Sequence, residues 1–374
     1  MSKSTAKIKK LFTEKISHDY LILSILAILP FLIFIEIFTG NKIFVGDVPG
    51  QDYPMRYYYG RILSQGYFPL WTSELNFGHP FFAEIHTGLL YPLNIFFSLI
   101  AYNFGFRIWQ LDILCHLSIA LILFYMYARE AGFSKTASLF FSICIATGGY
   151  VLMRTLHNSF LHSLVWTGGI MLYLRRFFST GSLKSIALFS LFLLASFFAG
   201  FPPVFFMQIL LTVIYSIVLI IPFLLQKKTH LLNKLPYAFA IFTIVFLLPA
   251  LLYLGFVYPL VEFSMRKDWP EIMYFGFRSK VMSFFHFIYH DWFKHHPDQG
   301  NWEFYSYSGS LSVFLAFYGI RKRIFSSPDA VFWMIAGLLG LIYANADNFI
   351  YRFFFHSVPG FDYFRCKVAG DQWH

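Results

Sequence analysis

Residues 20–38 read YLILSILAILPFLIFIEIF, an apolar run whose one charged side chain, Glu36, comes near its end. A membrane-spanning helix needs about 20 mostly apolar residues, so this run predicts a first transmembrane helix. Residues 1–19 are polar and rich in lysine, and no small-residue cleavage site is present. We therefore expect an uncleaved first span, preceded by a basic tail in the cytoplasm.

The composition of the whole chain agrees with that first run. Of 374 residues, 57% are hydrophobic and 13% are charged, about half of the roughly 25% that soluble domains carry. This excludes a disordered chain, a collagen-like chain and an ordinary cytosolic enzyme. The formal net charge is +10, from 29 Lys and Arg against 19 Asp and Glu. Because the basic residues cluster in short loops between apolar runs, they indicate topology and contact with membrane lipids, not nucleic-acid binding.

Further apolar runs predict an all-α polytopic protein with about nine transmembrane helices. The runs lie at 20–38, 108–128, 136–153, 160–174, 184–200, 203–225, 236–258, 307–320 and 330–346. Residues 88–101 are apolar but too short to span, and predict an interfacial or re-entrant helix. Basic residues alternate between loops, which places the N-terminus in the cytoplasm and two large loops, near 40–107 and 259–306, outside. We expect residues 20–374 to form one domain in the cytoplasmic membrane.

The first outer loop carries the candidate catalytic carboxylates. Asp47 and Asp52 lie five positions apart across Pro49 and Gly50, which favour a turn. Two carboxylates this close could act as base and orienter, or bind a cation jointly. Alternatively, each caps a helix or stabilises a turn.

Two arginines follow these carboxylates in the same loop. The spacing of Arg56 and Arg61 fits a helix at the membrane surface, where guanidinium groups could bind phosphate oxygens. Contact with lipid headgroups is the alternative.

Several segments together resemble the YfhO-like family of bacterial membrane proteins, which belongs to the GT-C class of glycosyltransferases. The resemblance is strongest for GDVPGQDY (46–53), GYFPLW (66–71), NFGHPFFAE (76–84) and LLYPLN (89–94). It continues in weaker form through 157–166, AGFPP (199–203), YSGSL (307–311) and VPGFDYFR (358–365).

The resemblance implies a GT-C-like helical bundle that transfers a sugar from a polyprenyl phosphate to an extracytoplasmic acceptor such as a cell-wall glycan. Asp47 takes the position of the family's leading acidic residue, with Asp52 beside it. A divalent metal ion is the one cofactor that the resemblance leaves open. The residues expected to bind substrate or phosphate are Gln51, Tyr53, Arg56, Arg61, His79, Glu84, His86 and Arg365.

The family usually continues past the arginine that matches Arg365 with several more spans, whereas this chain reads CKVAGDQWH and stops. We therefore expect a truncated member. Two other hypotheses stay open: a transporter or flippase of lipid-linked sugars, and an inactive family member.

Other candidate residues carry weaker signals. Asp112 and His116 share a helix face at a spacing of four, within an apolar run where ionisable residues are costly. His286 and His290 have the same spacing in the second outer loop, where a solvated loop is the more common explanation. The sequence contains no phosphate-binding P-loop, no dinucleotide-binding glycine motif and no C-x-x-C pair, and its three cysteines form no disulfide framework.

Overall fold

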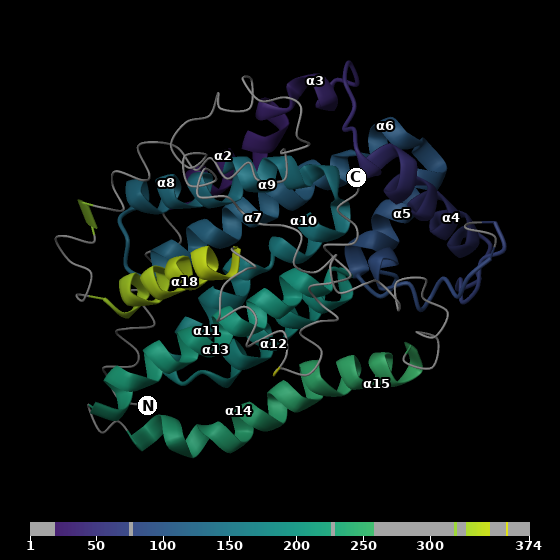
Figure 1. Cartoon of the computed structure of the whole chain (residues 1–374). Coiled ribbons are helices and arrows are strands. Elements are labelled where there is room, and N and C mark those ends of the chain that lie inside the picture. The colour runs from purple at the N-terminus through teal and green to yellow at the C-terminus, as the bar shows by residue number, and fades with distance from the viewer. Residues whose placement is uncertain are drawn as a thin grey trace.

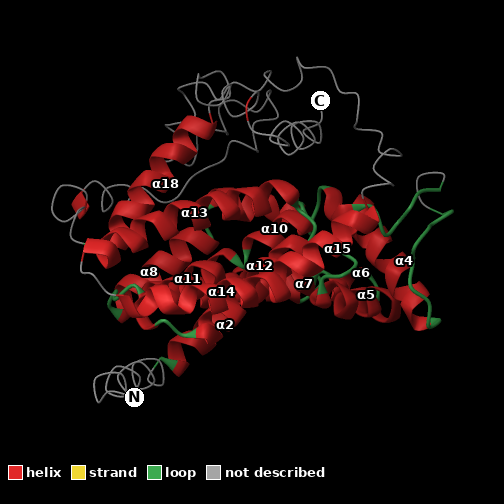
Figure 2. Cartoon of the chain, turned by 90° about the horizontal axis from the view of Figure 1, so that it is seen from below, coloured by secondary structure: helices red, strands yellow, loops and turns green. Residues whose placement is uncertain are grey.

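The computed structural model describes residues 19–74, 78–225, 229–257, 318, 319, 327–344 and 357. Within these ranges the chain is a bundle of helices without a β-strand, which confirms the predicted all-α class (Figure 2). The helices before the core are α2 (Tyr20–Ile33), α3 (Ile35–Phe38), α4 (Tyr53–Ser64), α5 (Pro92–Phe104) and α6 (Phe106–Trp109). Those of the core and beyond are α7 (Leu111–Glu130), α8 (Lys135–Ala146), α9 (Gly149–Met153), α10 (Asn158–Leu164), α11 (Thr167–Thr180), α12 (Leu183–Phe198), α13 (Pro202–Leu225), α14 (Leu235–Phe242), α15 (Leu248–Val257) and α18 (Pro328–Ala344).

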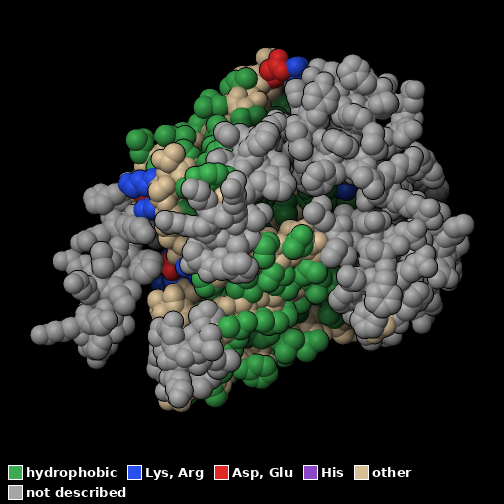
Figure 3. Space-filling view, turned by 60° about the vertical axis from the view of Figure 1, so that its left-hand side comes forward, with side chains coloured by type: hydrophobic (Ala, Val, Ile, Leu, Met, Phe, Trp, Pro, Cys, Tyr) green, Lys and Arg blue, Asp and Glu red, His purple; other side chains and the backbone are tan. Residues whose placement is uncertain are grey.

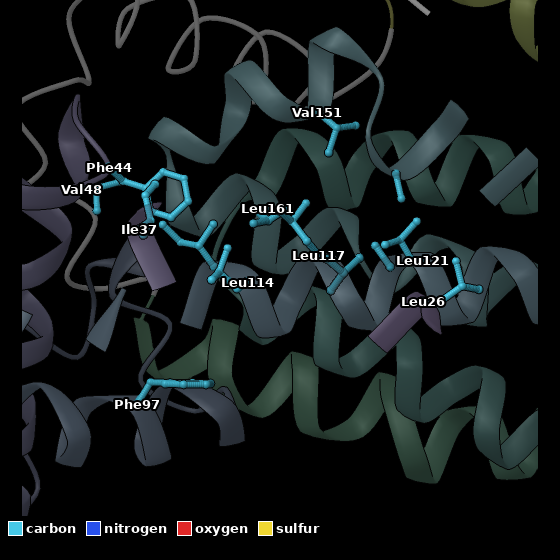
Figure 4. Packing of buried hydrophobic residues seen from close by; sticks show 14 of the residues in the cluster. Leu26, Ile37, Phe44, Val48, Phe97, Leu114, Leu117, Leu121, Val151 and Leu161 are labelled. Carbon is cyan, nitrogen blue, oxygen red and sulfur yellow. The ribbon is translucent and has the colours of Figure 1, made fainter. Parts of the chain in front are cut away.

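Helix α7 lies at the centre of the bundle, and α2, α8, α10 and α11 pack against it (Figure 1). Its side chains are apolar almost all round, as expected of a helix enclosed by others. Leu114, Leu117 and Leu121 form one stripe that faces Leu161 of α10 and Val151 of α9 (Figure 4). The central helix therefore fixes where its own polar residues meet those of α10.

Three helical runs are long and apolar enough to span a membrane in the part of the chain that the structure describes: Phe106–Glu130, Pro202–Ile221 and Leu235–Val257. The last two are only slightly buried, and large apolar side chains such as Ile217 and Leu252 are more than half exposed. Figure 3 shows that the described part of one face is mostly hydrophobic. Such a surface indicates a membrane protein. The expected count of nine spans stays a prediction.

Three predicted spans are interrupted in the structure. Residues 20–38 form α2 and α3, which separate at Phe34, four residues after the helix-weakening Pro30. Residues 136–153 form α8 and α9, bent by 40° next to the glycine pair Gly148 and Gly149. Residues 160–174 form α10 and α11, which are separated at Val165 and Trp166, because α10 ends at Leu164 and α11 begins at Thr167. The hydroxyl of Thr167 donates to the Leu164 carbonyl oxygen (2.7 Å) at this break.

The predicted interfacial segment 88–101 corresponds to α5, which packs along α4. The predicted span 307–320 and the outer loop 259–306, with its histidines, lie outside the described residues except for 318 and 319. The basic tail, apart from Asp19, also lies outside them.

Gly60 allows the close approach of α4 and α5. A Cβ at this position would collide with the carbonyl oxygen of Ser98 on α5. We expect Gly60→Ala to lower the free energy of unfolding by at least about 1–3 kcal/mol, because neither backbone can yield without moving its helix. Thermal unfolding in detergent measures this loss. Gly255→Ala is the matched control, since a Cβ there meets nothing within 4 Å and alanine favours the helix. Equal melting temperatures for the two variants would contradict the prediction.

Candidate active site at the outer loop

Asp47 precedes a single π-helical turn, Val48–Asp52, and Asp52 is the last residue of this turn, which leads into α4. Pro49 and Gly50 lie inside this turn, as the sequence suggested. Neither carboxylate makes a side-chain cap to its helix, although each stands directly before one. Neither residue is therefore the N-cap of the helix that it precedes, and both side chains reach across to another part of the bundle.

Asp47 pairs with His157, which directly precedes α10. Its Oδ2 lies 2.7 Å from Nδ1 of His157, across 110 positions of sequence. The Asp47 side chain is 48% exposed and that of His157 is 22% exposed. This pair thus combines a carboxylate that a substrate can reach with an imidazole that orients it, the arrangement of a general base.

Asp52 is more deeply buried than Asp47, and its partner is Asn158, the residue that follows His157. Its Oδ2 accepts a hydrogen bond from the backbone N–H of Asn158 (3.1 Å), and its side chain is buried. Burial raises the pKa of Asp52 to about 7, against the lowering effects of the Asn158 hydrogen bond and the positive charge of Arg56. A carboxyl group with this pKa changes charge near neutral pH.

The raised pKa of Asp52 predicts a pH-dependent stability. The pKa of Asp52 is about 7 in the folded protein and 3.8 in the unfolded reference state. Between pH 3.8 and pH 7 the folded protein therefore keeps a proton on Asp52 that the unfolded chain has lost. Stability is therefore highest at low pH and falls as pH rises toward 7, by about 3 kcal/mol between pH 5 and pH 8 at 1.36 kcal/mol per unit. Thermal unfolding in detergent at both pH values measures this. Asp52→Asn should remove most of the difference, and an unchanged difference would contradict the assignment.

Arg56 is buried inside the protein, not exposed at a surface. It donates to the carbonyl oxygen of Thr87, and burial lowers its pKa while Asp52 and Asp112 oppose that change. Its Nε has no hydrogen-bond partner among the described residues. Binding of phosphate by Arg56 stays a prediction, and it would require the phosphate to enter between the helices.

Arg61 lies farther along α4 and pairs with Glu74 of the same loop. Its guanidinium also lies over the ring of Tyr58, 5.5 Å from the centroid. These contacts hold the loop against α4, and a role of Arg61 in phosphate binding remains untested.

The other predicted substrate residues are spread along the loop. Gln51 is exposed within the π-helical turn, and the Tyr53 ring packs on Phe106 and Trp109. His79 pairs through its backbone with Thr72, Glu84 precedes the short turn Ile85–Thr87, and the His86 ring contacts Phe201. Gln51 and Tyr53 thus lie next to Asp47 along the chain, whereas His79, Glu84 and His86 belong to later parts of the loop. Arg365 lies outside the described residues.

A second polar cluster lies beneath this site, between α7 and α10. Asp112 and His116 meet as their spacing predicted, with Oδ1 and Nδ1 2.7 Å apart, and His162 of α10 approaches Asp112 Oδ2 at 3.1 Å. Tyr91 contacts Nε2 of His116 (2.8 Å) and accepts a hydrogen bond from Trp166 (3.1 Å).

The sequence analysis named no role for His157, Asn158, His162 or Tyr91. The available signal was the pair of histidines five positions apart in a weakly apolar run, together with the family-like segments that contain them.

Comparison of the chain with models of protein families, with curated proteins and with solved structures finds no match. The function is therefore argued from the residues and their geometry.

Proposed function

We propose that this protein is a membrane glycosyltransferase that moves a sugar from a polyprenyl phosphate to a hydroxyl group of an extracytoplasmic acceptor. The observation that carries the proposal is the Asp47–His157 pair, in which a half-exposed carboxylate of the first loop is oriented by a histidine distant in sequence.

The surroundings of this pair support the same proposal. Segments that resemble the YfhO-like family meet here although they are far apart in sequence. The 46–53 segment contacts the 157–166 segment through Asp47 and Asp52. Convergence of these segments is what a shared site requires.

Asp47 acts as the base in this mechanism. The acceptor hydroxyl gives its proton to the free carboxylate oxygen of Asp47 while its own oxygen bonds to the anomeric carbon of the sugar. The bond from that carbon to the phosphate oxygen breaks, and the phosphate leaves with the electron pair. His157 holds the other carboxylate oxygen and so fixes the direction of proton transfer.

Arg154 supplies the positive charge for the departing phosphate in this mechanism. It begins the short turn Arg154–Leu156 that leads directly to His157. Its guanidinium lies 5.4 Å from the ring centroid of Tyr150 and 5.5 Å from that of Phe160. These rings hold the positive charge three positions before His157 in the sequence, and a cation there stabilises the negative charge that develops during transfer.

A proteoliposome assay separates this proposal from its alternatives. The purified protein is reconstituted with undecaprenyl phosphate that carries a radiolabelled sugar on the lumenal leaflet, together with a bacterial cell-envelope extract as acceptor. Movement of label from the lipid to the polar extract supports a transferase. Movement of labelled lipid between leaflets without transfer indicates a flippase, and absence of both across a panel of sugars indicates an inactive protein; either result rejects the proposal.

A further inference from the structure

Asp112, His116 and His162 form a cluster of titratable side chains that the proposed transfer reaction does not use. All three side chains are fully buried; Asp112 and His116 belong to α7, and His162 belongs to α10. One ligand atom from each lies within 4.8 Å of the others. Burying a carboxylate and two imidazoles in a membrane bundle is costly, so such a group calls for a compensating interaction.

The hydrogen bonds of the cluster leave both ring nitrogens of His162 and both carboxylate oxygens of Asp112 without a hydrogen-bond partner among the described residues. Nδ1 of His116 faces both the carboxylate and the backbone carbonyl oxygen of Asp112, and Nε2 of His116 faces Tyr91. Nε2 of His162 faces the second carboxylate oxygen. The three side chains thus converge on one another, and the protein around them satisfies them incompletely.

We propose that Asp112, His116 and His162 bind one divalent transition-metal ion. Two neutral imidazoles and one carboxylate suit zinc, iron, manganese or cobalt, and are a poor set for calcium or magnesium, which prefer oxygen ligands. The two rings lie nearly parallel, with centroids 3.9 Å apart, and both present a nitrogen to the same carboxylate. In a tetrahedral site with metal–ligand bonds near 2.0 Å, two ligand atoms lie about 3.3 Å apart. Binding of an ion would therefore move the imidazole nitrogens and the carboxylate oxygens slightly apart from their present 2.7 and 3.1 Å.

In the bound state the proton of each imidazole lies on the nitrogen away from the ion, and for His162 that is Nδ1, which has no hydrogen-bond partner in the part of the chain that the structure describes. Each neutral imidazole binds through a lone pair and keeps its one proton on the other nitrogen. For His116 that nitrogen is Nε2, which donates to the oxygen of Tyr91 at 2.8 Å. Histidine ligands are commonly held in this way by a second residue, and Trp166 in turn holds Tyr91.

Arg56 links the cluster to the loop that carries Asp47 and Asp52. Asp112 supplies one negative charge, and Arg56 lies close enough to interact with both Asp112 and His162. Asp52, which directly precedes α4, interacts with Arg56 and offsets part of its positive charge. The metal site therefore lies beneath the outer loop and is linked to it through Arg56.

Metal content of the purified protein tests the proposal directly. The protein is produced with a purification tag that contains no histidine, incubated separately with Zn²⁺, Mn²⁺, Fe²⁺ and Co²⁺, and passed through metal-free buffer. Mass spectrometry of the elements should find about one ion per chain for at least one metal. The Co²⁺ form should show the visible absorption that imidazole and carboxylate ligands give to this ion.

Variants assign the ion to these residues. His116→Ala and His162→Ala should lose the ion, while His86→Ala should keep it, because the His86 ring contacts Phe201 and lies outside the cluster. Tyr91→Phe retains all three ligands and should weaken metal affinity by about 10–100-fold.

An ion-free wild-type protein after all four incubations would overturn the proposal, whatever the variants do. Equal metal content in wild type and in a monodisperse His162→Ala protein would do the same. Neither result depends on sugar transfer, so this inference and the proposed function fail separately.

Discussion

Replacing Asp47 with asparagine should reduce sugar transfer by about 10²–10⁴-fold, the usual contribution of a positioned general base. Asparagine keeps the shape of the side chain but cannot take the proton of the acceptor hydroxyl. The contact to His157 Nδ1 can persist through the amide oxygen, so the turn should keep its position. Initial rates of label transfer in proteoliposomes measure the loss, and the amount of protein in the membrane should not change.

Glu36→Gln is the matched control for Asp47→Asn. Glu36 is an exposed carboxylate at the other end of α3 from the loop, paired with Lys42, and belongs to no part of the proposed site. Its loss should leave the rate of transfer unchanged. Retained transfer in Asp47→Asn would reject Asp47 as the base, and an equal loss in Glu36→Gln would show that the effect is not specific.

The largest effect on stability is expected for Asp329→Ala, at the start of α18. The Asp329 carboxylate is buried, lies 2.6 Å from a guanidinium nitrogen of Arg175 and accepts hydrogen bonds from Tyr215 (2.5 Å) and Tyr127 (3.3 Å). Removing it leaves a mostly buried arginine and two buried hydroxyl groups without their acceptor. Breaking a buried ion pair in this way costs about 3–5 kcal/mol.

Thermal unfolding of the purified protein in detergent measures this loss. The control is Glu36→Ala, which removes a carboxylate from an ion pair with Lys42 whose side chains are both more than half exposed. Exposed pairs contribute at most about 1 kcal/mol, so this variant should melt close to wild type. If Asp329→Ala melts no lower than Glu36→Ala, the carboxylate does not fasten α18 to α11 and α13.

The apolar runs of the sequence predict where most helices lie, because a helix in a membrane satisfies its own backbone hydrogen bonds. Helices α7, α12 and α13 agree with the predicted runs to within a few residues. The runs do not predict breaks, because a break leaves hydropathy unchanged. The division between α10 and α11 depends on the Thr167 hydroxyl and on close packing of Gly168 against α7.

The same distinction holds for the candidate site. The sequence alone identified Asp47 and Asp52 as the notable carboxylates, and it placed Asp112 and His116 on one helix face because four residues make about one helical turn. It indicated nothing of the approach of His157 to Asp47 or of His162 to Asp112, nor of the burial of Arg56. Those relations join segments up to 110 positions apart.

Local spacing thus determined which residues share an element and a face. Packing of α10 against α7 decided which helix faces meet. Helix pairing depends on how the side chains of two helix surfaces fit together, and local spacing within one helix does not predict that fit. The pairing of the half-exposed Asp47 with His157, and the buried Asp–His–His cluster, are for that reason properties of the tertiary structure.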